Sequence, residues 1–173
     1  MNRINRLFVI AVFLLAIVDG LKFLHAQEKL HSSASLKGVA EMGLLIENIN
    51  PSLDSAGIDG TTVKNIVLDK LDEIGIKTVP MKELVNIKGA PYLYLNIGAI
   101  KSSQGNIFSI SVNVEFRQNV ILSRNTKLES FGTPTWTISS IGLFSKDKIT
   151  RLYDFVKKAI DKFIYAYSYA NSH

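Results

Sequence analysis

The polar side chains with the most distinctive spacing lie in the stretch FSISVNVEFRQNVIL, residues 108–122. Glu115 and Arg117 are two positions apart, so they share one face of an extended strand. With a second carboxylate from a neighbouring strand, such as Glu41 or Glu47, Glu115 could support hydrolysis by paired acids. The simpler interpretation is an ion pair on a solvated strand face, which contributes little to stability.

The arginines in this region suggest binding more than catalysis. A guanidinium group binds carboxylate or phosphate through two parallel hydrogen bonds, so Arg117, Gln118 and Arg124 form a candidate partner contact. Glu115 and Trp136 complete this candidate set. The structural alternatives stay open: Arg117 can pair with Glu115, and a strand tryptophan is more often part of a core than of a recognition surface.

Other catalytic equipment is scarce. The three histidines are His25, His31 and His173. None falls in an expected core element, so neither a histidine base nor a histidine metal site is predicted. The chain has no cysteine, which excludes thiol nucleophiles, disulfides and zinc–thiolate sites. No phosphate-binding glycine loop occurs, and Asp54, Asp59 and Gly60 lack the spacing of a calcium loop. We therefore predict no enzyme, no cofactor and no metal.

The charge of the chain is concentrated at one end. The formal net charge is +5, and after Ser145 six basic residues face three acidic ones. A nucleic-acid-binding domain usually spreads basic residues across its fold, so no nucleic-acid partner is expected. The basic residues of the last segment could contact anionic lipid. They are Arg151, Lys157, Lys158 and Lys162. A solvated helix face is the alternative, because Asp154 and Asp161 lie on the same side.

The N-terminus resembles an export signal. Arg3 and Arg6 precede an unbroken apolar run of twelve residues, from Leu7 to Val18. This run is shorter than the roughly 20 residues that a membrane-spanning helix needs, and it is typical of a secretory signal. The absence of cysteine excludes a lipid anchor behind the leader.

We therefore expect a signal peptide over 1–26, a polar tether over 27–35 and a single domain over 36–173. The protein is then periplasmic or secreted. The alternative is that residues 7–24 are retained as an anchor in the inner membrane.

The elements that must position the polar residues follow from hydrophobic periodicity. Strands are expected over 38–50, 76–80, 92–100, 108–122 and 133–142, and helices over 61–75 and 146–169. These elements predict an α+β, two-layer sandwich: a four- to five-stranded, mainly antiparallel sheet with both helices on one face. The even positions from Phe108 to Phe116 should meet the helices. A bulge is expected near Gln118, where the alternation weakens.

Four short motifs resemble those of a family of uncharacterised exported bacterial proteins. They are PYLYLNI (91–97), VEFRQNVILSRN (114–125), GTPTW (132–136) and IDKFIYAYSYAN (160–171). The likeness covers roughly residues 36–171. It implies export but brings no activity with it. At the level of the fold, the chain is also similar to small envelope domains such as the LPS-assembly lipoprotein and the curli-secretion lipoprotein, whose lipidated cysteine it lacks.

Together these features predict an exported, non-enzymatic envelope domain that binds a protein partner through a polar sheet face or an edge strand. Two alternatives stay open: an accessory protein that binds an apolar ligand or lipid, and a carboxylate-dependent hydrolase. The sequence leaves the partner, the oligomeric state and the strand order undetermined.

Overall fold

The computed structural model describes residues 33–172. The expected signal peptide lies outside these residues. The elements are η1 (Ala34–Leu36), β1 (Glu41–Ile46), α2 (Pro51–Asp54), α3 (Gly60–Asp72), β2 (Lys77–Val79), η2 (Met81–Asn86), β3 (Tyr92–Lys101), β4 (Ile107–Ile121), β5 (Glu129–Ser145), η3 (Lys146–Arg151) and α4 (Leu152–Asn171). No helix within residues 33–172 is long and apolar enough to cross a membrane.

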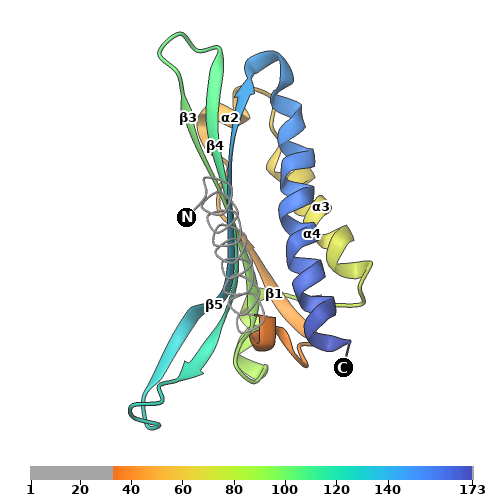
Figure 1. Ribbon diagram of the computed structural model, residues 1–173, viewed down its shortest axis with the longest axis vertical. Coiled ribbons are helices and arrows are strands. Elements are labelled where there is room, and N and C mark those ends of the chain that lie inside the picture. The colour runs from red at the N-terminus through yellow and green to blue at the C-terminus, as the bar shows by residue number, and fades with distance from the viewer. Residues whose placement is uncertain (1–32, 173) are drawn as a thin grey trace, which may run out of the picture.

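The strands form one mixed sheet in the order β2-β1-β3-β4-β5. β1 is parallel to both β2 and β3, whereas β3, β4 and β5 are antiparallel neighbours. Figure 1 shows the sheet edge-on, with α3 and α4 together on one side of it. The predicted α+β class and two-layer arrangement are confirmed. The antiparallel pairings are the longest ones, as the sequence suggested.

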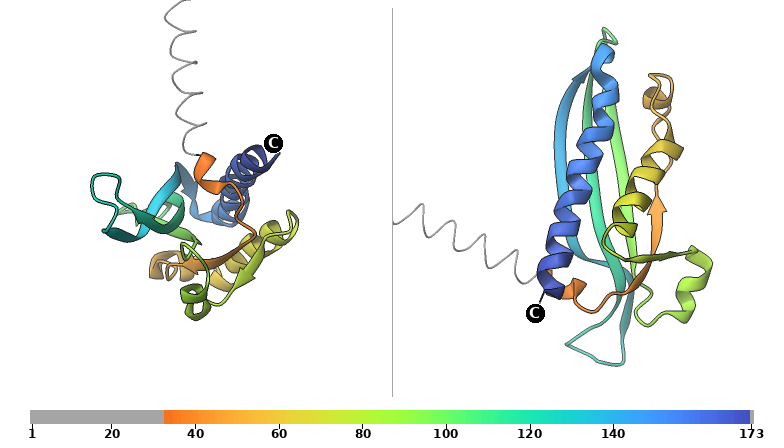
Figure 2. Two further views of the ribbon diagram at one scale, coloured as in Figure 1. Left: turned by 90° about the horizontal axis from the view of Figure 1, so that it is seen from below. Right: turned by 90° about the vertical axis from the view of Figure 1, so that its right-hand side faces the viewer.

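The β4–β5 hairpin is longer than the sequence indicated. β5 begins at Glu129 and not at position 133, because the segment predicted as a polar loop forms only the tip of the hairpin. Figure 2 shows this hairpin extending beyond the end of α4. The register shifts between Phe116 and Arg117 and again between Gln118 and Val120. The predicted bulge is therefore confirmed.

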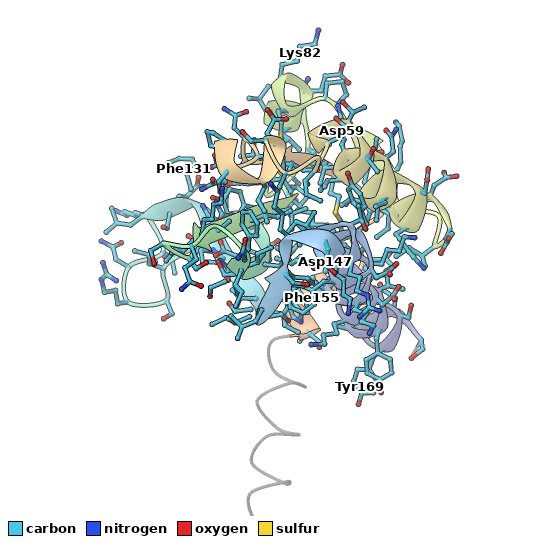
Figure 3. The ribbon with its side chains drawn as sticks, turned by 90° about the horizontal axis from the view of Figure 1, so that it is seen from above. Asp59, Lys82, Phe131, Asp147, Phe155 and Tyr169 are labelled. Atoms are coloured by element: carbon cyan, nitrogen blue, oxygen red, sulfur yellow. The ribbon has the colours of Figure 1, made fainter. Side chains whose placement is uncertain are left out.

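Local signals set the ends of α3. The carboxylate of Asp59 accepts hydrogen bonds from the backbone N–H groups of Thr61 at 3.1 Å and Thr62 at 2.8 Å, which satisfies donors that an uncapped helix leaves unpaired. Asp59 stands at the first turn of α3 (Figure 3). Gly75 follows the helix with a φ of +73°, a conformation that favours glycine. The short helix α2, capped by Asn50, was predicted as loop.

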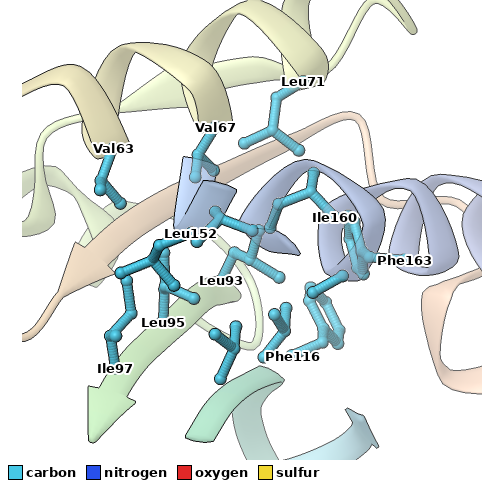
Figure 4. Close-up of a cluster of buried hydrophobic side chains, with 14 of the residues drawn as sticks. Val63, Val67, Leu71, Leu93, Leu95, Ile97, Phe116, Leu152, Ile160 and Phe163 are labelled. Atoms are coloured by element: carbon cyan, nitrogen blue, oxygen red, sulfur yellow. The ribbon is translucent and has the colours of Figure 1, made fainter. Parts of the chain in front are cut away.

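The core lies between the sheet and the two long helices (Figure 4). The even residues of β4 from Phe108 to Phe116 are at most 1% exposed, in agreement with the predicted alternation. Phe163 of α4 is fully buried and contacts an aromatic cluster. Its ring centroid lies 5.4 Å from that of Trp136 and 6.4 Å from that of Phe116. Burial of these large side chains is the main favourable term that holds α4 on the sheet.

The first described segment is tied to the end of α4. Asn171 donates from Nδ2 to the Leu36 carbonyl at 3.1 Å and accepts from the Gly38 N–H at 2.8 Å. The Tyr167 hydroxyl donates to the Val39 carbonyl at 2.7 Å. Residues 33–35, which the sequence assigned to the tether, therefore include the start of η1 and pack with the domain.

Candidate functional site

The two faces of the sheet differ in what covers them. α3 and α4 pack on one face, and the opposite face, here called the open face, carries the odd residues of β4 (Figure 1). On the β1 side, η2 packs against the open face. Gly43 makes this possible, because a Cβ at that position would lie 2.8 Å from Met81 Sδ and 2.9 Å from Leu84 Cδ1.

A connected set of polar and aromatic side chains lies beside η2 on the open face. We call it the arginine cluster, and its members are Glu47, Tyr92, Tyr94, Glu115 and Arg117. Tyr92 is paired with Arg117 across β3 and β4, and Tyr94 is paired with Glu115. Opposite neighbours in a sheet lie close enough for their side chains to interact.

The contacts within the arginine cluster run from β4 to the end of β1. Arg117 Nε donates to Glu115 Oε2 at 2.6 Å. The Arg117 guanidinium carbon lies 4.4 Å from the centroid of the Tyr94 ring, a cation–π arrangement. The Tyr94 hydroxyl donates to Glu47 Oε1 at 3.1 Å. The guanidinium is thus held in one orientation from two sides.

Partial burial and charge shape the titration of the arginine cluster. Burial acts to lower the pKa of Arg117, but the hydrogen bonds to Glu115 and Tyr92 and the charge of Glu115 outweigh it and raise that pKa. Burial, together with the hydrogen bond to Glu47, raises the pKa of Tyr94 above 10.0. At neutral pH the arginine is therefore charged and the tyrosine is a hydrogen-bond donor.

The arginine cluster is better suited to binding than to catalysis. Glu115 accepts from Arg117 and Glu47 accepts from Tyr94, so both carboxylates already have donors. Two carboxylates against one guanidinium give the cluster a formal charge of −1, which disfavours a phosphate ligand. Among residues 33–172, no three histidine, cysteine, aspartate or glutamate side chains gather in a way that could hold a metal ion.

The structure brings together two of the five residues in the predicted contact set, Glu115 and Arg117. Gln118 lies at the bulge and donates from Nε2 to Thr135 Oγ1 at 3.0 Å. Trp136 is only 6% exposed and packs edge-on against Phe163, so it belongs to the core. Arg124 lies at the exposed tip of the β4–β5 hairpin.

Sequence reasoning missed the two tyrosines of the arginine cluster. The alternation in YLYL was the available signal, because it places Tyr92 and Tyr94 on the face opposite to the buried Leu93 and Leu95. Glu47 was considered only as a second acid for Glu115.

The four basic residues of the last segment, Arg151, Lys157, Lys158 and Lys162, are all exposed on the helix side of the molecule. Lipid contact through them stays a prediction.

An exposed apolar patch lies on the open face at the opposite end of the strands from the arginine cluster. Ile100, Ile141 and Leu143 are 76%, 77% and 76% exposed. Ile100 and Leu143 both lie opposite Ser109 in the register of the sheet, and Ile141 is in the next row of the same face. Small residues, Gly98, Ser109 and Ser111, lie between them in the register of the sheet.

The chain matches no protein-family model and no curated protein. Several solved structures are similar to about three quarters of this chain. One is the PelC dodecamer from Paraburkholderia phytofirmans, at 13% identity and a TM-score of 0.42 over 75% of this chain and 87% of that chain. Another is the rare lipoprotein B from Shewanella oneidensis, at 14% identity and a TM-score of 0.36 over 73% and 92%.

A third similar structure is a minor lipoprotein from Acinetobacter baumannii, at 8% identity and a TM-score of 0.30 over 73% of this chain and 94% of that chain.

Proposed function

We propose that this chain is an exported, non-enzymatic domain of the bacterial envelope that binds a protein partner on its open sheet face. The observation that carries the proposal is the arginine cluster, whose charged and aromatic side chains are held in place on a face that α3 and α4 leave uncovered. Export is supported by the apolar run that follows Arg3 and Arg6.

The chemistry of the arginine cluster favours a protein partner. It offers both donors and acceptors within one small area, since the Arg117 guanidinium lies beside the Glu115 carboxylate and over the Tyr94 ring, whose hydroxyl bonds to Glu47. The side chains of Arg117 and Glu115 are 30% and 22% exposed, so each is half-buried and yet accessible. A protein surface can match such a mixture of charges, and pre-organised side chains lose less conformational entropy on binding.

The test is co-purification from the native cell with a tagged full chain. Replacing Glu115 and Arg117 together by alanine removes both charges, so the folded domain should persist while capture of the partner falls at least tenfold. A matched control is the ion pair between Lys70 Nζ and Asp161 Oδ1, 3.1 Å apart on the helix side of the molecule. Its double alanine variant should capture the partner normally.

Equal capture by the Glu115/Arg117 variant and the wild type would refute a role for the open face. Loss of capture in both double variants would indicate a general effect on folding or export, which circular dichroism and the amount of exported protein would reveal. The intact mass of the protein from the same cells tests the export prediction, because a cleaved leader shortens the chain by about 26 residues.

A further inference from the structure

The outer edge of β5 is the longest strand edge at the margin of the sheet. β5 is the last strand in the order, and it spans Glu129–Ser145. The N-terminal part of this edge is protected from pairing with another strand. Pro134 has no N–H group to donate, and the Thr135 carbonyl accepts a hydrogen bond from Ser35 Oγ at 3.2 Å. Neither of these two protections extends beyond position 135.

Beyond Thr135, the alternate backbone groups of β5 point outward. The Lys146 N–H donates to the Asn106 carbonyl at 2.9 Å, which extends the β4–β5 ladder by one pair. In an antiparallel ladder only every second pair is hydrogen-bonded, so the even residues of β5 bond to β4. The N–H and C=O groups of the odd residues therefore point to the outer edge. These residues are Thr137, Ser139, Ile141, Leu143 and Ser145.

This segment has none of the charges that usually protect an edge. Residues 130–145 contain no lysine, arginine, aspartate or glutamate. Natural proteins place such charges, prolines or bulges on edge strands to prevent pairing with another chain. Here Ile141 and Leu143 are three-quarters exposed instead. An uncharged edge with exposed aliphatic side chains favours association with another strand.

We propose that residues 137–145 of β5 pair with the same segment of a second copy of this chain, antiparallel and about a twofold axis at Ile141. Such an interface uses one surface twice, as twofold dimers do. The two five-stranded sheets then join into one continuous sheet. The open faces of the two copies become one surface, so the dimer presents its two arginine clusters on the same face, at opposite ends of the joined sheet.

The sequence of this segment is complementary to itself in the proposed register. Ile141 lies opposite its own copy on the open face, and Thr137 lies opposite Ser145 of the second copy. On the helix face, Ile138 lies opposite Phe144 of the second copy, a β-branched and aromatic pair that stabilises sheets. Phe144 is already fixed by Phe155, at 5.5 Å between ring centroids. A register moved two residues toward Pro134 would engage Thr135, whose carbonyl Ser35 already occupies.

Site-specific cross-linking of the full chain tests both the dimer and its register. The chain has no cysteine, so Ile141→Cys introduces a single thiol. We expect a short bis-maleimide to convert this variant into a covalent dimer. Ile100→Cys is the matched control, with the same residue type, the same face and 76% exposure. It lies two strands further in, so its copy would be about 24 Å away at a strand spacing of about 4.8 Å.

A charge at the twofold axis supplies the second test. Ile141→Lys places two like charges opposite each other, while an exposed position tolerates lysine in the folded monomer. Sedimentation equilibrium should give twice the chain mass for the wild type and a single mass for Ile141→Lys, with the same circular dichroism. A monomeric wild type, equal cross-linking of Ile100→Cys and Ile141→Cys, or a dimer that Ile141→Lys leaves intact would each overturn the proposal. These outcomes do not depend on partner capture by the arginine cluster.

Discussion

Phe163→Ala is the perturbation that should damage the fold most for a single change. The Phe163 side chain is fully buried, and its ring contacts three other aromatic rings, those of Trp136, Phe116 and Tyr167, with centroids 5.4, 6.4 and 6.4 Å away. Truncation of a buried phenylalanine costs about 3–5 kcal/mol. Each aromatic pair contributes roughly 0.5–1.5 kcal/mol beyond burial, so we expect the upper end of that range.

Urea denaturation followed by tryptophan fluorescence measures this loss directly, because Trp136 is the single tryptophan and touches Phe163. The expected free energy of unfolding falls by about 4–5 kcal/mol, a large share of the 5–15 kcal/mol typical of a domain. Phe131→Ala is the control, since that side chain is 74% exposed and its loss should cost at most about 0.5 kcal/mol. Similar midpoints for the two variants would refute the packing of α4 on the sheet.

Three further changes test the local arguments. Gly43→Ala should destabilise the domain by about 1–3 kcal/mol in the same urea assay, because its Cβ would overlap the side chains of η2, and a neutral result would contradict the close approach of η2 to β1. Hydrogen bonds from Thr62 and Thr61 lower the pKa of Asp59 below 3.8, so its stabilising effect is present above that pH and is lost as pH falls through the folded pKa. The melting temperature of Asp59→Asn should therefore be lower than that of the wild type at pH 6. In acid below the folded pKa of Asp59 the two melting temperatures should be equal, and a constant difference would argue against a charged cap. Burial and the hydrogen bond to Glu47 raise the pKa of Tyr94 above 10.0. The wild type should therefore be more stable than Tyr94→Phe by its full margin below about pH 10, and this margin should decline as the pH rises further. A difference in melting temperature that stays constant across that range would count against the hydrogen bond.

The sequence predicts those parts of the fold that depend on local patterns. The alternation from Phe108 to Phe116 gave the buried face of β4, and Asp59 and Gly75 gave the ends of α3. Each of these signals acts within a few residues of the structure that it determines. The bulge near Gln118 was predictable for the same reason, since the loss of alternation is visible in the chain itself.

Features that depend on contacts between distant segments were not predictable. Gly43 looks like an ordinary strand glycine until η2, about forty residues later, is seen to pack on it. The parallel pairing of β1 with β3 depends on the path of α3, and no local pattern specifies it. Trp136 had two acceptable interpretations, and only the position of Phe163 decides between them.

The candidate site follows the same division. Glu115 and Arg117 were predicted as neighbours because they belong to one strand. Tyr94 and Glu47 come from β3 and from the end of β1, so the arginine cluster emerges only when the strand order and register are known. Arg124 was part of the predicted contact set, but the length of the β4–β5 hairpin carries it away to the exposed tip.

The most direct test of partner binding is photo-cross-linking in the native cell. A photoreactive amino acid at Asn113, which neighbours Glu115 on the open face and lies opposite Ser139, one strand in from the β5 edge, should form an adduct with a protein other than a second copy of this chain. The same probe at the exposed Lys158 of α4 should give none, and replacing Glu115 and Arg117 by alanine should remove the adduct at Asn113. Adducts that form only at Lys158, or an Asn113 adduct that persists without Glu115 and Arg117, would contradict binding through the arginine cluster.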